Sequence, residues 1–219
     1  MKAKTVLAVA ALALGASVAS ADVLWNQAPD LAQSGFFNSI SGAPPFGVTA
    51  YVVGDITVPA GGWNVDSITM YFGDIESGGS WQTSVTQGRL YIQPKTGSIP
   101  TAAPSGALIP MSATSLFDNT YQQAYYAVTA SGLAQVLAAG DYWIGITPAA
   151  PGGFFGPEIG LSSSGVLGST SAVYDAGFPS WAALTTDAAI TVNGTAVPAP
   201  AGLALLAVGG LAASRRRRA

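Results

Sequence analysis

The sequence predicts an all-β protein, an antiparallel β-sandwich resembling a jelly roll, and three observations lead to this prediction. Apolar residues alternate with polar ones over short runs, these runs are separated by Gly, Pro, Ser and Asn, and the middle of the chain contains no pattern typical of a long helix. About eight such strands would form two sheets packed face to face. A closed barrel is the alternative architecture.

Length and composition favour one domain between two short terminal segments. Of the 219 residues, we assign 1–21 and 197–219 to the terminal segments and 22–196 to the domain. A domain of this length folds without disulfides or a structural metal. The chain has no cysteine and no histidine, which excludes disulfides, thiolate metal sites and imidazole bases. We expect no cofactor.

Charge is distributed unevenly along the chain. The domain holds only two cations, Arg89 and Lys95, because the other basic residues lie near the two ends. All eleven acids, from Asp22 to Asp187, lie in the domain, whose net charge is therefore near −9. Phosphate recognition depends on clustered Lys and Arg, so we expect no nucleic-acid partner.

The first strands follow from alternation. Ala50 to Val58 reads as a strand, and the Pro-Ala-Gly-Gly sequence at 59–62 as a turn, since proline fixes φ and glycine tolerates positive φ. Residues 68–72 alternate so that Ile68, Met70 and Phe72 would face the core. Residues 89–93 alternate in the same way, which would place Arg89 on the solvent-exposed face.

The second half of the domain continues this pattern, with one helix. We predict a surface loop or a crossing between sheets over 95–110, a strand over 121–129, and a short helix from Leu133 to Ala139 ended by Gly140. A strand over 141–147 would follow, with Trp143 on the face opposite Ile144. After it we predict a loop over 148–160 and short strands over 172–175 and 188–192.

Catalytic candidates are few. Asp74 and Glu76 are two residues apart, so their side chains would point the same way in a strand. Such a pair of carboxylates could catalyse glycoside hydrolysis. The Gly- and Ser-rich sequence that follows favours a solvated loop instead. Glu158 stands alone between glycine-rich turns. A serine nucleophile would have to use Lys95 as its base, and no supporting motif is present. We therefore predict no catalytic residues and no enzymatic activity.

The sequence offers candidates for two further kinds of site, a metal site and a sugar-binding site. Calcium needs only oxygen ligands, but the sequence has no EF-hand loop, so no metal ligand is assigned. Trp81 and Trp181 lie in loop-like settings and could stack on sugar rings, which makes a carbohydrate-binding module the alternative function. Packing in the core is the competing role for these rings.

The N-terminal segment has the three parts of a secretory signal peptide. A basic start at Lys2 and Lys4 is followed by an apolar stretch and by the small residues Ala19 and Ala21. We expect cleavage after Ala21. The apolar stretch is shorter than the roughly 20 residues that span a bilayer, which favours a cleaved signal over a permanent anchor.

The C-terminal segment has three parts as well. Its prolines end the last strand, its apolar stretch from Ala201 to Ala213 would form a short membrane helix of about 20 Å, and its arginines would stay on the cytoplasmic side. The residues of the first and last parts are Val197, Pro198, Ala199 and Pro200, and Arg215, Arg216, Arg217 and Arg218.

This arrangement resembles the PEP-CTERM sorting signal of exported bacterial proteins, in which a proline-containing motif, an apolar helix and an arginine cluster follow one another. Ala199 stands where that family usually has glutamate. The resemblance implies passage through the export translocon and handling by an exosortase-like membrane protease. It predicts an exported protein that is membrane-anchored at least transiently and then reaches the cell surface or the extracellular matrix, where exopolysaccharide is a candidate partner.

Overall fold

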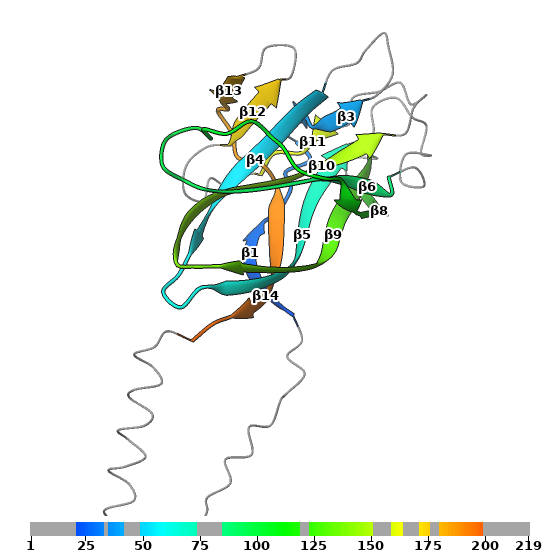
Figure 1. Ribbon diagram of the computed structural model, residues 1–219. Coiled ribbons are helices and arrows are strands. Elements are labelled where there is room, and N and C mark those ends of the chain that lie inside the picture. The colour runs from blue at the N-terminus through cyan, green and yellow to red at the C-terminus, as the bar shows by residue number, and fades with distance from the viewer. Residues whose placement is uncertain are drawn as a thin grey trace, which may run out of the picture.

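The computed structural model of the chain is built from β-strands, and it describes residues 21–32, 35–41, 49–73, 85–118, 123–150, 159–163, 171–175 and 180–198. These residues form two sheets and contain no helix, so the all-β prediction is confirmed (Figure 1). No helix in these ranges is long and apolar enough to cross a membrane. Residues 1–20 of the predicted signal peptide and the C-terminal residues from 199 onwards lie outside the described residues.

The first sheet has β5 at its centre, with β14 and β1 on one side and β9 and β8 on the other. Two short strands, β11 and β2, continue the sheet beyond the end of β14, where β11 pairs with the last residues of β5. The bounds are β1 Asp22–Gln27, β2 Phe36–Phe37, β5 Trp63–Gly73, β8 Ser112–Asp118, β9 Gln123–Leu137, β11 Ile159–Gly160 and β14 Ile190–Ala196.

The second sheet has the order β13, β12, β4, β3, β10, β6 and β7, and β4 also pairs directly with β10. Among the described pairs only β3 with β10 is parallel, and all others are antiparallel. The bounds are β3 Ser39–Ser41, β4 Thr49–Val58, β6 Gln87–Pro94, β7 Ile109–Pro110, β10 Gly140–Ala150, β12 Ala172–Asp175 and β13 Ser180–Ala183.

The two sheets face each other across one apolar core, as in a sandwich. Alternate residues of β5 contribute the fully buried side chains of Ile68, Met70 and Phe72, as the sequence predicts. From the second sheet, β4 and β10 contribute residues such as Ile56 and Ile144 to the same cluster. Burying each of these side chains stabilises the fold by about 1.5–3 kcal/mol relative to leaving it exposed.

Two tight turns carry the chain from one sheet to the other at the same end of the molecule (Figure 1). β4 passes into β5 through residues 59–62, where Gly62 has a φ of 95° and its amide donates to the Pro59 carbonyl at 3.0 Å. β9 passes into β10 through residues 138–139. A Cβ atom on Gly62 would lie 2.5 Å from the Leu137 carbonyl oxygen, so the two turns pack directly against each other.

The buried Asn38 holds β4 and β10 together where these strands diverge. Its Nδ2 donates to the Ile146 carbonyl at 3.1 Å, and its Oδ1 accepts from the Val52 amide at 3.2 Å and the Thr147 hydroxyl at 2.6 Å. Buried backbone groups need such partners. β4 and β10 pair directly at one end, and β3 lies between them at the other end. In the stretch between these two parts, the Asn38 side chain takes the place of backbone hydrogen bonds between the strands.

The predicted helix from Leu133 to Ala139 is wrong, because residues 133–137 continue β9. The strand pairs with β5 up to Leu137, opposite Trp63, and a bulge in this pairing bends it. Gly132 and Ala134 adopt positive φ values of 67° and 48° there. Pairing with β5 thus overrides the local helix propensity of this apolar segment.

Other predictions need smaller corrections. Residues 148–150 belong to β10 and not to the loop that follows it, and the last strand runs from Ile190 to Ala196. β8 was not predicted, because its residues lie on an edge and lack a regular buried pattern. The strands at 50–58 and 172–175 agree closely with β4 and β12.

Candidate functional site

The outer face of the second sheet carries a cluster of large aromatic side chains, which we call the aromatic face. Its members come from five strands, since every second residue of each strand points outward. The rings pack edge-on or tilted, with centroids 5.2 Å apart for Tyr91 and Trp181, 5.4 Å for Tyr174 and Trp181, and 6.1 Å for Tyr51 and Tyr174. The members are Tyr51, Tyr91, Trp143, Tyr174 and Trp181.

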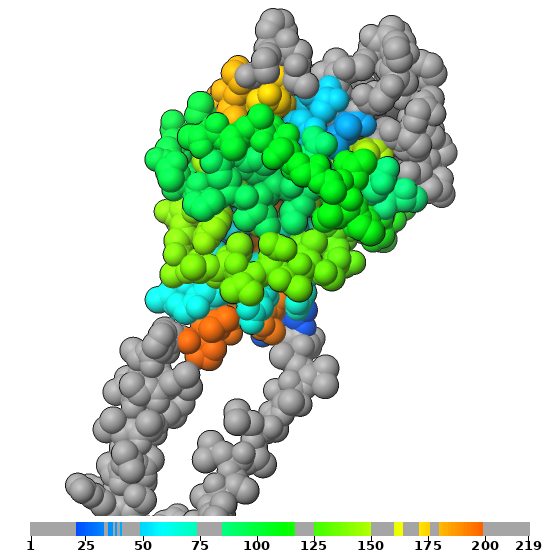
Figure 2. Space-filling view, viewed as in Figure 1, coloured from blue at the N-terminus to red at the C-terminus, as the bar shows by residue number. Residues whose placement is uncertain are grey.

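The aromatic face is covered by residues 95–108, which we call the strap. The carbonyl oxygen of Ala102 accepts hydrogen bonds from the Trp181 indole at 2.7 Å and from the Tyr91 hydroxyl at 3.0 Å. Gln93 on β6 bonds the strap as well, through Thr101. In Figure 2 the front of the molecule is covered largely by green residues, the part of the chain that includes the strap. The predicted surface loop over 95–110 is confirmed for residues 95–108, whereas Ile109 and Pro110 form β7. This loop closes over a second, smaller core.

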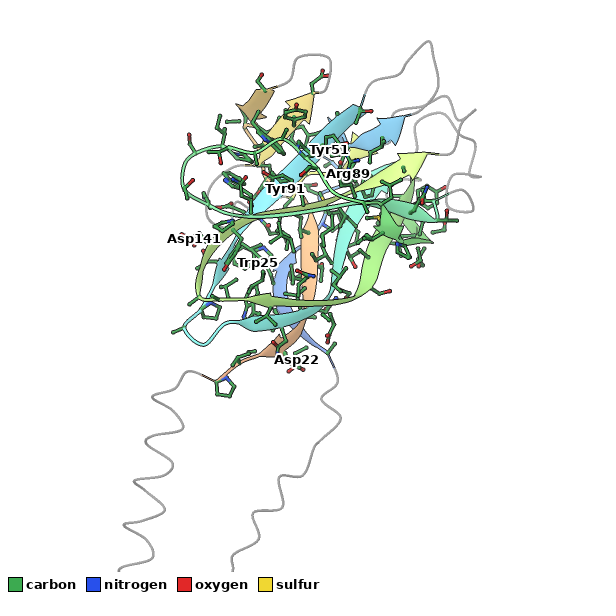
Figure 3. All side chains as sticks on the ribbon, viewed as in Figure 1. Asp22, Trp25, Tyr51, Arg89, Tyr91 and Asp141 are labelled. Carbon is green, nitrogen blue, oxygen red and sulfur yellow. The ribbon has the colours of Figure 1, made fainter. Side chains whose placement is uncertain are left out.

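The two cations of the domain lie on this same face. One nitrogen of the Arg89 guanidinium donates a hydrogen bond to the Tyr51 hydroxyl, and the Cζ atom of Arg89 lies 5.4 Å from the centroid of the Tyr51 ring (Figure 3). The Nε atom of Arg89 is buried without a hydrogen-bond partner in the described part of the chain. Arg89 lies on the outer face of β6, as predicted, but it is half-buried there and not fully in contact with solvent. The alternation of β6 does not reveal the aromatic layer beside it.

Lys95 occupies the other side of the aromatic face. Its ammonium forms an ion pair with Asp55, whose side chain is 4% exposed, and lies 4.9 Å from the centroid of the Trp143 ring. Attraction to the face of a tryptophan ring is the strongest form of cation–π contact. The indole N–H of Trp143, like the Nε of Arg89, is a buried donor without a partner among the described residues.

The two phenols of this face that lie beside the strap and Arg89 stay protonated at neutral pH. Burial raises the pKa of Tyr51, although Arg89 opposes this and Tyr174 adds to it, and burial raises the pKa of Tyr91 to about 12. Neither phenol ionises near neutral pH. Apart from the partly buried Tyr174, the rings are almost fully covered, and the hydroxyls of Tyr51 and Tyr91 and both cations already have partners within the chain. The aromatic face is therefore a second, covered core, and Trp181 on the outermost strand is the most exposed of its buried rings, at 9%.

A second polar cluster lies inside the sandwich, around the fully buried Asp187. Its carboxylate accepts hydrogen bonds from Gln27, from the Ser171 hydroxyl at 2.7 Å and from the Ala188 amide at 3.0 Å. Burial raises the pKa of Asp187, these three hydrogen bonds oppose the rise, and the charge of Asp55 adds to it. The cluster joins β1 to the segments before β12 and β14, which is a structural role.

The residues predicted to be functional are described only in part. Trp181 belongs to the aromatic face, with 9% of its surface exposed and its indole bonded to Ala102, and glycan stacking by this ring stays a prediction. Ala21 is exposed directly before β1, and Val197 and Pro198 directly follow β14. The remaining candidates lie outside the described residues: Ala19, Asp74, Glu76, Trp81, Glu158, Ala199, Pro200, Arg215, Arg216, Arg217 and Arg218.

Sequence reasoning missed most of the aromatic face. Tyr51 and Tyr91 stand at alternate positions of predicted strands, so their outward direction was available from the sequence. What the sequence did not disclose is that the strap converts this outward face into a buried one. Within the described residues no group of three or more acidic side chains could hold a metal ion.

Compared with known proteins, the chain matches no family model, no curated protein and no solved structure. The fold and the aromatic face therefore define the molecule only as an all-β protein of two sheets with a covered aromatic cluster on one of them.

Proposed function

We propose that this chain is an exported, non-enzymatic protein of the bacterial cell surface or extracellular matrix, routed by its C-terminal segment. The observation that supports this proposal is the position of the fold within the chain. β1 begins at Asp22, directly after the expected signal cleavage at Ala21, and β14 ends at Ala196, directly before the sorting segment. Cuts at both predicted sites would release the domain with every described strand intact.

We also assign the sandwich to the jelly-roll type. The chain crosses from one sheet to the other between β4 and β5 and again between β9 and β10, at the same end of the molecule. The first and last strands of the domain, β1 and β14, pair with each other. Both features fit a wrapped double-sheet architecture.

Mass spectrometry of the native protein tests the proposal. Intact-mass and terminal analysis of membrane, surface and medium fractions should find a mature chain that begins at Asp22 and ends between Val197 and Pro200. A control with Arg215–Arg218 replaced by glutamine should accumulate with its tail uncut. A native protein that begins at Met1 in intact cells would contradict export, and one that keeps its arginines would indicate a permanent anchor.

A carbohydrate-binding module is the second candidate, and the observation that supports it is the position of Trp181 on β13, the outermost strand of the second sheet, where the ring keeps 9% of its surface exposed. Glycan-array binding by the purified domain should weaken in Trp181→Phe, which keeps a ring but loses the bond to Ala102, and in Trp81→Ala. Thr114→Ala on β8 serves as the control for a distant, exposed substitution. Absence of binding to a broad panel of neutral and acidic glycans would remove this candidate.

A further inference from the structure

The two large apolar side chains most exposed to solvent in the described part of the chain lie at one end of the sandwich. Val136 on β9 is 76% exposed and Val23 on β1 is 62% exposed, whereas the next, Leu108 and Ile99, are only 37% and 36% exposed. Val136 pairs with Asn64 of β5, and Val23 pairs with Asn193 of β14. Both are therefore near the turn between β4 and β5, at the end from which β1 starts and β14 leaves (Figure 1).

The surroundings of Val136 lack charge, whereas Val23 directly follows the exposed Asp22. We call this surface the corner end and define it as residues 59–64, 132–140 and 194–198, which include no Lys, Arg, Asp or Glu. Several of its small apolar residues are exposed, among them Ala60, Ala139 and Pro198. The exposed charged side chains nearest to it, Asp22, Asp66 and Asp141, are all acidic.

The chain itself limits how far the corner end can lie from the predicted membrane helix. The Val197 amide donates to the Gly62 carbonyl at 2.9 Å, which fixes the start of the sorting segment to the turn between β4 and β5. The predicted helix begins at Ala201, four residues later. A fully extended chain covers at most about 3.6 Å per residue, so the helix starts within about 14 Å of this turn.

We propose that the corner end rests on the outer surface of the lipid bilayer while the tail anchors the protein, with Val136 among the lipid headgroups. This inference rests on the proposed function, because it needs the tail in the membrane. An uncharged surface of small residues with an exposed valine gains free energy by leaving water. The contact is apolar, since acidic neighbours gain nothing from anionic lipids, and it should therefore resist salt.

Site-directed fluorescence in vesicles tests the proposal with the chain from Asp22 to Ala219. The protein has no cysteine, so Val136→Cys and the control Thr114→Cys on β8 each accept a single fluorophore. Phosphatidylcholine vesicles would carry a nitroxide on their headgroups. We expect quenching at position 136 to be severalfold stronger than at position 114 and to be unchanged by added salt.

A second reporter separates contact from mere proximity. A fluorophore on Ala60→Cys should lose at least half of its quenching when Val136→Glu is added, and should keep it when Thr114→Glu is added. Both glutamates replace exposed residues, so folding is preserved. Equal behaviour of the two glutamate variants would overturn the inference.

The possible failures point to different conclusions. A chain that does not float with the vesicles overturns the proposed membrane anchor and this inference together. A chain that floats but is quenched equally at positions 136 and 114 overturns only the inference. Disulfide-linked dimers of the unlabelled Val136→Cys variant on the vesicles, together with weak quenching of the labelled one, would overturn it in favour of a second copy of the chain at the corner end.

Discussion

The outer faces of the two sheets follow the same alternation but have opposite fates. On the first sheet, hydroxyl groups pair across strands, with Thr69 and Thr129 at 2.8 Å and Tyr71 and Thr191 at 3.1 Å, and these side chains stay partly exposed. On the second sheet, the corresponding positions carry the aromatic face, and the strap buries it. Period-two alternation thus defines two faces of a strand, but a distant segment decides whether the second face meets water.

The largest expected effect comes from removing the centre of the aromatic face. Trp143→Ala should lower the free energy of unfolding by about 3–5 kcal/mol, because the fully buried ring leaves a cavity. Thr69→Ala, at the centre of the first sheet's outer face, should cost about 1 kcal/mol or less. Denaturant unfolding followed by far-ultraviolet circular dichroism measures both. Similar losses would show that the two faces are energetically alike.

The ion pair beside Trp143 should give the next effect. Lys95→Met should destabilise the protein by about 3 kcal/mol, because it leaves the buried carboxylate of Asp55 without its cation. The double variant Lys95→Met with Asp55→Asn should recover part of this loss. A double-mutant cycle from unfolding curves checks the coupling, and strictly additive losses would contradict it.

Tyr91 should make stability depend on alkaline pH. Burial raises its pKa to about 12, so the folded protein holds the phenol proton more tightly than the unfolded chain, whose phenols titrate near pH 10. The stabilisation is complete below pH 10 and should be lost as the pH rises towards 12. The difference between absorbance titrations of wild type and Tyr91→Phe isolates this phenol. A midpoint near pH 10 would show that the strap does not exclude water.

The smallest effect is expected on the first sheet. Thr191 hydrogen-bonds both the Tyr71 hydroxyl and the side-chain carbonyl oxygen of Asn26, the latter at 3.0 Å. Thr191→Val removes these bonds on a partly exposed face where water replaces them, so the loss should stay within about 1 kcal/mol. Thermal unfolding of Thr191→Val and of Tyr91→Phe compares the loss of a partly exposed hydroxyl with the loss of a buried one. A larger loss of stability for Thr191→Val would contradict the expected order.

Local pattern and distant contact explain which predictions agreed with the structure. The core positions of β5 and β10, such as Ile68 and Ile144, were predictable, because every second residue within each of these strands is apolar. The helix at 133–139 failed because pairing with β5, about seventy residues earlier, decides its conformation. The half-burial of Arg89 was not predictable for the same reason, since the ring that covers it, Tyr51, comes from another strand. The Asp187 cluster was unpredictable, because Gln27 and Asp187 are far apart in sequence.

The position of β14 within its sheet has a mechanical consequence. This strand leads directly to the sorting segment, and it lies between β1 and β5, with hydrogen-bonded ladders along both sides. If the tail is anchored as proposed, a pull on it along the strand axis would load both ladders in shear, so that the bonds on both sides of β14 must break together. An edge strand pulled in the same direction would be held by one ladder only. The central place of β14 would therefore distribute tension from the tail over strands on both of its sides.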